Sequence, residues 1–296
     1  MLRAAAVVVV AVCVAAPAQA SNLIDRDVAN AKLVVTPDGA AHLLYSKAGR
    51  AKHVVAYDAV NARFPARGAR QVEFEVNYSA GWRTPYHAPD PSKLVNACGR
   101  YRGPALPWFL AACTARDGSH WALQTWQRML PNFGRVAGQD LAATDLRLSH
   151  WTGELPVFTV KQDWAYAGRW DHLYGSLTYL GRPMFGFGTT SYGSPLDSWG
   201  VLVYVDVFGS PWGRGWKRVD SFVTHNPTGI FCYTLSDKGN RPAGEGSRYR
   251  ATVVGPGVLP DLLWESKAPG AYDKSLDDAS NREQWERFTD KACRPN

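Results

Sequence analysis

The sequence predicts an all-β fold, an antiparallel β-sandwich of the jelly-roll-like kind with a short C-terminal helix. Many short runs alternate between apolar and polar residues, as strands with one wet face do. Turn signals that draw on 27 glycines and 19 prolines separate these runs. A helical pattern occurs only near the end of the chain. Short antiparallel strands joined by such turns favour a sandwich over an α/β fold.

Residues 1–20 predict a secretory signal peptide, so we expect a secreted protein whose mature chain begins at Ser21. Arg3 gives the positive start, residues 4–16 the apolar run, and residues 18–20 (AQA) the small-residue cleavage site. The run is too short for a transmembrane helix and no later run is long enough, so no membrane-spanning segment is expected after cleavage. A lipoprotein signal would need cleavage before Cys13, where the bulky Val12 is unfavourable.

Four cysteines would remain after cleavage, and an exported chain favours two disulfides among three possible pairings. We favour Cys98–Cys113, because the two are close in sequence, and Cys232–Cys293, because this bond would tie down the C-terminus. No CxxC spacing predicts a structural zinc site, and no motif predicts a metal or a cofactor.

The N-terminal region predicts a β-meander over residues 21–62. Residues 33–46 form two short strands around the turn 37–39 (PDG), and a turn at 48–49 leads into a third strand, 53–59. A connector rich in Ala, Arg, Pro and Gly follows at residues 60–70. We place the main sandwich domain at residues 63–296, with the meander packed on it or leading into it.

The main domain predicts a series of strands and one helix. Residues 71–78 (QVEFEVNY) alternate strictly, and residues 107–128 form a hairpin around the turn Asp117-Gly118. The helix is expected at about 280–291, because Ser280 and Glu283 fit a capping box and Trp285, Phe288 and Ala292 follow at helical spacing. The other expected strands are 145–150, 157–166, 170–180, 200–208, 217–224, 229–235 and 247–254.

Two segments, QVEFEVNYSAGW (71–82) and THNPTGIFCYTL (224–235), resemble stretches of uncharacterised secreted bacterial proteins. The resemblance covers most of the chain after residue 60. It implies a common exported β-rich fold and no particular activity, so it transfers no catalytic residues.

The motifs of several enzyme classes are missing from the sequence. It contains no HExxH, no Walker loop and no GxSxG nucleophile elbow. Glycoside hydrolases and lyases remain possible, because their carboxylates leave little local signature.

The segment DWAYAGRWDHLYG (163–175) predicts a hairpin with a two-residue turn at Ala167-Gly168. On this register Tyr166 pairs with Arg169, and Asp163 lies opposite His172. One face carries the large apolar residues of both strands, and the other is polar with two aromatic residues, Trp170 and Tyr174.

Asp163 and His172 are therefore expected to hydrogen-bond across the two strands. A carboxylate that orients an imidazole is half of an acid–base pair, and as an enzyme the protein would use these two residues. The alternative is a cross-strand pair that only fixes the hairpin, and the sequence favours this structural role.

Twelve tryptophans are a heavy aromatic load, and some of them lie beside turns. Trp212, Arg214 and Trp216 belong to a glycine-rich loop and could line a groove next to Trp170 and Tyr174. Aromatic faces beside polar groups suit sugars, and an arginine suits a carboxylate or sulfate. The alternative is that the glycines allow tight turns and the tryptophans cap the end of the sandwich.

The formal net charge of +7 without long basic runs suits a weakly anionic partner and gives little support for nucleic acid. The leading hypothesis is a secreted, non-enzymatic protein that binds a carbohydrate or an anionic envelope polymer through Trp170, Tyr174, Trp212, Arg214 and Trp216. The alternatives are a secreted glycan hydrolase or lyase and a structural or interaction protein of the cell surface.

Overall fold

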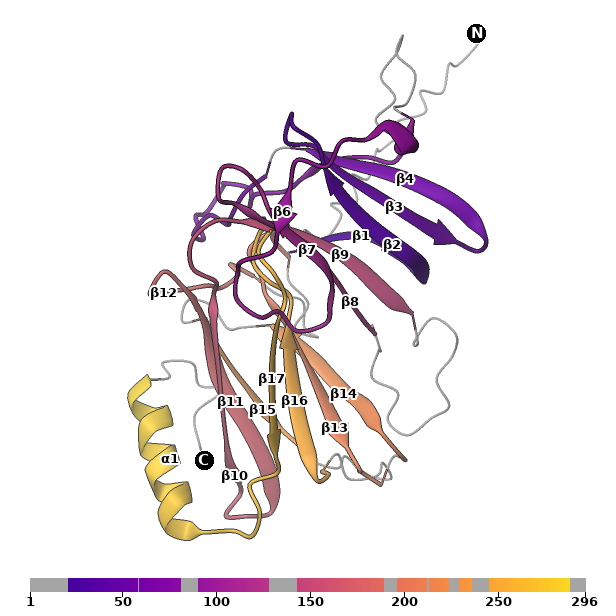
Figure 1. Cartoon of the computed structure of the whole chain (residues 1–296). Helices are drawn as coiled ribbons and strands as arrows, with labels where there is room; N and C mark the ends of the chain where they lie inside the picture. The colour runs from indigo at the N-terminus through magenta and orange to yellow at the C-terminus, as the bar shows by residue number, and fades with distance from the viewer. Residues whose placement is uncertain are drawn as a thin grey trace, which may run out of the picture.

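The structure confirms the predicted antiparallel β-sandwich with a short C-terminal helix (Figure 1). Of the residues that the structure describes, 48% lie in strands and 8% are helical. This computed structural model describes residues 21–57, 59–80, 90–127, 143–188, 196–211, 213–223, 229–235 and 245–287, the last four residues of the range 213–223 by their backbone only. In these ranges no helix is long and apolar enough to cross a membrane.

Two sheets form the N-terminal half of the molecule, at the top of Figure 1. The first has the order β2-β3-β4-β5 and the second has the order β1-β9-β8-β7-β6. Their strands are β1 (Asn22–Arg26), β2 (Val28–Val35), β3 (Ala41–Lys47), β4 (Arg50–Tyr57), β5 (Glu75–Asn77), β6 (Gly99–Arg100), β7 (Phe109–Thr114), β8 (His120–Gln127) and β9 (Thr144–Trp151). A short 3₁₀ helix, η1 (Pro91–Lys93), lies between β5 and β6. Apolar residues between the two sheets, among them Leu43, Trp121 and Leu148, form one core.

Two further sheets form the other half. The first has the order β10-β11-β12, with β15 also paired to β11, and the second has the order β14-β13-β16-β17. Their strands are β10 (Val157–Ala165), β11 (Trp170–Tyr179), β12 (Arg182–Pro183), β13 (Leu202–Phe208), β14 (Trp216–Val223), β15 (Ile230–Thr234), β16 (Arg248–Val253) and β17 (Leu262–Lys267). Leu173, Val205 and Phe231 lie in the core between them.

Strand β8 contributes to both cores. Trp121 and Leu123 point into the N-terminal core, whereas Ala122, between them, belongs to the other core. Successive side chains of a strand point to opposite faces, so one strand can serve two cores at once. The N-terminal meander therefore does not stand alone, and the domain boundary at residue 62 stays a prediction.

Most of the expected strands are present, and one is shorter than expected. The strict alternation at residues 71–78 predicted a strand, but only Glu75–Asn77 pairs, with β4. Before it, the side-chain oxygen of Gln71 accepts hydrogen bonds from the backbone N–H groups of Arg63 and Val72, both at 2.8 Å. The backbone here is satisfied by side chains and not by a neighbouring strand.

The C-terminal helix, α1 (Lys274–Arg287), begins six residues before the expected start at Ser280. Asp273 caps it, because its Oδ1 accepts from the backbone N–H groups of Ser275 at 2.8 Å and Leu276 at 3.1 Å. The expected end of the helix lies outside the described residues. So do Phe288 and Ala292, whereas Trp285 lies within α1 and is 53% exposed.

One of the two expected disulfides is present, Cys98–Cys113, which joins the start of β6 to β7. Cys232, on β15, is also disulfide-bonded. Cys293 lies outside the described residues, so Cys232–Cys293 stays a prediction.

Candidate functional site

The β10–β11 hairpin has the register that the sequence predicts, with Asp163 opposite His172. Its turn is wider than expected. Ala165 and Trp170 form the last pair, so residues 166–169 make a four-residue loop and Tyr166 does not pair with Arg169 in the ladder. Tyr166, Ala167 and Gly168 all have positive φ angles, of 55°, 54° and 85°. These three successive residues in the left-handed region of φ reverse the chain in a four-residue loop, in place of the expected two-residue turn.

The Asp163–His172 pair is buried, and each carboxylate oxygen of Asp163 accepts a hydrogen bond. His172 Nδ1 lies 2.7 Å from Asp163 Oδ1, and Gln284 Nε2 donates to Asp163 Oδ2 at 2.6 Å. The exposed fractions are 2% for Asp163 and 9% for His172. The polar face of the hairpin is therefore covered by α1, which lies along β10 and β11 in Figure 1.

Helix α1 is held on the hairpin by polar contacts. Ser280 Oγ and the Tyr174 hydroxyl are 2.7 Å apart, and Lys161 Nζ lies 2.5 and 2.6 Å from the two carboxylate oxygens of Glu283. Burial raises the pKa of Tyr174 to about 12. The buried residues of the helix are Asp277 and Gln284, one heptad apart. This helix docks through hydrogen bonds instead of the apolar stripe that is usual for a surface helix.

A groove of about 590 Å³ runs beside the helix, between α1, β10 and β17. Its volume falls in the roughly 300–1,000 Å³ range of small-molecule sites. Aromatic rings and hydrogen-bonding side chains both line it. The aromatic lining residues are Trp164, Tyr174 and Trp264, and the polar ones are Lys161, Gln162, Asp163, Ser266, Ser280 and Glu283.

Of the residues that the sequence proposed for ligand binding, Tyr174 lines the groove and Trp170 does not. Trp170 lies at the hairpin loop, where its ring makes a T-shaped contact with Tyr166, the centroids being 5.0 Å apart, and the Arg169 guanidinium lies 4.5 Å from its centroid. Tyr174 is only 3% exposed, so it offers no open ring face to a ligand.

The glycine-rich loop contributes to a different sheet. Trp216 begins β14, 5.3 Å from the ring of Phe208, and the guanidinium groups of Arg250 and Arg248 lie 4.4 and 5.5 Å from its centroid. Arg214 is exposed in the turn before β14, and Trp212 lies outside the described residues. The Trp216 ring is thus already packed against the protein's own cations, which is a structural use of the aromatic face.

Sequence reasoning missed the two residues that give the groove its character. Trp164 was assigned to the core face of the hairpin, and it is indeed 7% exposed, but it also lines the groove. Trp264 lies on β17, a strand that was not expected, so nothing placed it beside β10. A turn signal at residues 255–257 (GPG) before the run LLWESK could have revealed this strand.

The fold and the groove define this chain as a β-sandwich protein with one helix-covered polar–aromatic site. No family model matches the chain, and no curated protein or solved structure matches it significantly. Among the described residues, no group of three or more His, Cys, Asp or Glu side chains could hold a metal ion. The site must therefore be interpreted from its own chemistry.

Proposed function

We propose that this protein is exported and binds a glycan or another hydroxyl-rich polymer of the cell envelope in the groove between α1, β10 and β17. The observation that supports the proposal is the lining of this groove, which combines Trp264, Trp164 and Tyr174 with six polar side chains. Sugars present apolar C–H faces and hydroxyl edges together, so a site for them needs both kinds of surface. Export is supported by the Cys98–Cys113 disulfide, since disulfides persist in oxidising compartments.

The chemistry of the lining suggests how a sugar would be held. Trp264 is half-buried, so part of its ring surface stays open to a ligand. Gln162 stands between the groove and β17, where its Nε2 donates to Lys267 O at 2.6 Å. Lys161 and Glu283 form a partly exposed ion pair at the rim and could exchange it for hydroxyl groups or for an acidic substituent. The net charge of +7 favours an anionic polymer over a neutral one.

The catalytic alternative, a glycan hydrolase or lyase, has one supporting observation, since Asp163 lines the groove. However, the acid or base in this alternative is His172, which Asp163 would orient at 2.7 Å, and His172 is 9% exposed and is not among the described residues that line the groove. A general acid or base must come within hydrogen-bond reach of its substrate. Proton transfer between His172 and a ligand in the groove would require the site to rearrange, so binding is the better-supported function. A structural protein of the cell surface would use the exposed loops, and it predicts indifference to sugars.

The test is depletion of the exported, oxidised protein from solution by a panel of polysaccharides and cell-wall preparations, with mass analysis of each supernatant. Depletion without new oligosaccharides is the expected result. New oligosaccharides would make the protein an enzyme, and no depletion by any preparation would overturn the proposal.

Three variants locate the site. Trp264→Ala should weaken binding about tenfold, the scale of one aromatic contact of ~1.5 kcal/mol. Ser266→Trp should block the groove sterically without removing a core residue. Trp170→Ala, a tryptophan outside the groove, should bind normally. Loss of binding in Trp170→Ala with normal binding in the other two would place the site at the hairpin loop.

A further inference from the structure

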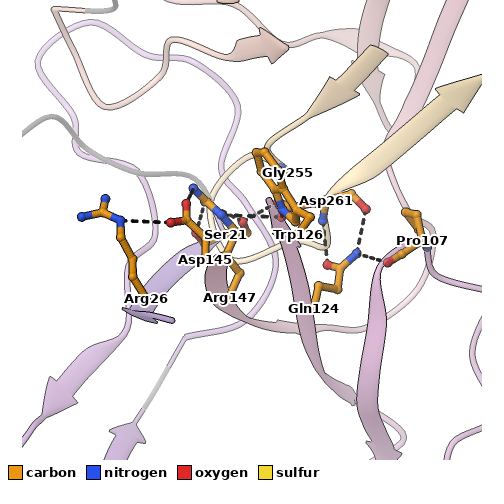
Figure 2. Close-up of polar contacts among 9 residues, drawn as sticks. All are labelled: Ser21, Arg26, Pro107, Gln124, Trp126, Asp145, Arg147, Gly255 and Asp261. Carbon is orange, nitrogen blue, oxygen red and sulfur yellow. Dashed lines mark hydrogen bonds and ion pairs between the residues drawn. The ribbon is translucent and has the colours of Figure 1, made fainter. Parts of the chain in front are cut away.

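A buried cluster of charged groups lies where the two halves of the molecule meet, and Ser21 is part of it (Figure 2). Asp145, Arg147 and Asp261 are each at most 4% exposed, and Ser21 is fully buried. Figure 2 shows Asp261 between Gln124 on one side and the Ser21 and Arg147 pair on the other. Ser21 is also the residue at which the predicted mature chain begins.

Asp261 is held firmly at the centre of this cluster. Its carboxylate accepts from Trp126 Nε1 at 2.7 Å, from the Gly255 backbone N–H at 3.0 Å, and from the Ser21 hydroxyl. The Gln124 side-chain amide bonds both backbone groups of Asp261, at 2.9 and 3.0 Å. The carboxylate therefore cannot turn away to reach solvent.

Ser21 is fixed beside this carboxylate by Arg147. Nη1 of Arg147 donates to the Ser21 carbonyl at 3.1 Å and to its hydroxyl at 3.2 Å. The α-nitrogen of a serine is about 3 Å from its own Oγ by covalent geometry. The Ser21 nitrogen thus lies within roughly 6 Å of the Asp261 carboxylate, a range in which an opposite charge acts strongly.

The guanidinium groups of the cluster lie closer to Asp145 than to Asp261. Asp145 receives Arg147 Nη2 and Arg26 Nε, both at 3.0 Å, whereas the nearest guanidinium nitrogen to Asp261 is Arg147 Nε at 3.8 Å. Arg26 is partly exposed at the edge. Asp145 thus has two guanidinium partners at hydrogen-bond distance, whereas Asp261 has the more distant Arg147 Nε, and burial raises the pKa of Asp261. A cation next to Asp261 would pair this carboxylate directly.

We propose that removal of the signal peptide supplies this cation, and that the new α-ammonium group of Ser21 forms a buried ion pair with Asp261. A secretory endopeptidase would hydrolyse the Ala20–Ser21 peptide bond with one water molecule, leaving a carboxylate on Ala20 and an amine on Ser21. The amine takes up a proton and lies beside Asp261 and Arg147, and Arg147 in turn contacts Asp145, which Arg26 pairs from the other side. Cleavage thereby ties β1 to the β16–β17 connection and makes the mature fold more stable than its precursor. This inference rests on the predicted signal cleavage and not on glycan binding.

The test starts from the full chain produced through a secretory pathway and purified as the exported product. Its N-terminal residue is read by mass spectrometry, and the α-amine is then acylated over a range of pH in the native and the denatured protein. We expect Ser21 at the N-terminus and acylation at least tenfold slower in the native protein at neutral pH, with a pH profile shifted upward from the ordinary α-amino pKa of about 7.7–8.0.

The direction of this shift separates pairing from simple burial, because burial alone lowers the pKa of an amine and an ion pair raises it. Asp261→Asn should remove this pairing and shift the pH profile of α-amine acylation to lower pH. A precursor with one extra alanine between Ala20 and Ser21 moves the amine by about 3.8 Å and should also lose the upward shift. A different N-terminal residue, or a native profile that equals the denatured one or lies below it, would overturn the proposal, even if neither variant folds.

Discussion

Replacement of Gln284 by alanine should release helix α1 while the rest of the fold stays intact. Gln284 is 1% exposed, and its Nε2 donates to Asp163 Oδ2 at 2.6 Å in a site where Asp163 is 2% exposed. A hydrogen bond to a charged group contributes about 1.5–3 kcal/mol. The helix buries only one other residue, Asp277, so little apolar packing compensates for the loss.

Hydrogen exchange measures this release directly. Since about 1.4 kcal/mol is a factor of ten, the amides of Lys274–Arg287 should exchange roughly 10 to 150 times faster in Gln284→Ala. Arg282→Ala, which shortens an exposed side chain of the same helix, is the control and should leave exchange unchanged. Unchanged exchange of α1 in Gln284→Ala would show that the polar contacts do not hold the helix, and the reasoning on its docking would be wrong.

Two further predictions concern charged groups elsewhere in the structure. Asp206→Asn should cost about 3–5 kcal/mol of unfolding free energy in a urea titration, because it breaks the buried pair with Arg218, whereas Glu265→Gln, at a partly exposed pair, should cost less than about 1 kcal/mol. Equal costs would contradict the role of burial. The unfolding free energy should also fall with pH below about 6.5, because burial lowers the pKa of His42 and His53 from the value of 6.5, so the unfolded chain takes up protons that the folded chain refuses. His42→Gln should flatten that dependence, and a steeper one would be inconsistent with it.

The part of the site that the sequence could predict is the part determined by local periodicity. The register of β10 and β11 follows from the alternation in both strands, since a slip by one residue would put polar side chains into the core. The Asp163–His172 hydrogen bond then follows from the register alone.

The helix start could not be found this way, for a reason visible in the structure. Ser280 and Glu283 fit a capping box, but they lie inside α1, one turn apart on the face toward the hairpin, where they bind Tyr174 and Lys161. The same residue types serve to dock a helix on a sheet and to cap its N-terminus. Only tertiary contacts distinguish these uses.

The groove itself depends on elements that are distant in sequence. Trp264 and Gln162 line the same groove because β17 lies against β10, and the sequence pattern of one strand does not show that the other is its neighbour. The tryptophans that composition made conspicuous, Trp170 and Trp216, instead pack against arginines of their own surroundings.

Strand β8 has a consequence for how the molecule comes apart. Its odd and even positions serve different cores, Trp121 and Leu123 on one side and Ala122 on the other. If either half melted, β8 would be left with one face against water while the opposite face still held the surviving half together. An intermediate with one unfolded half would therefore expose to water a face of β8 that is buried in the native state, and this exposure would destabilise the half that is still folded. Four sheets should consequently unfold in a single cooperative step, and a protease should find no stable half-molecule to release.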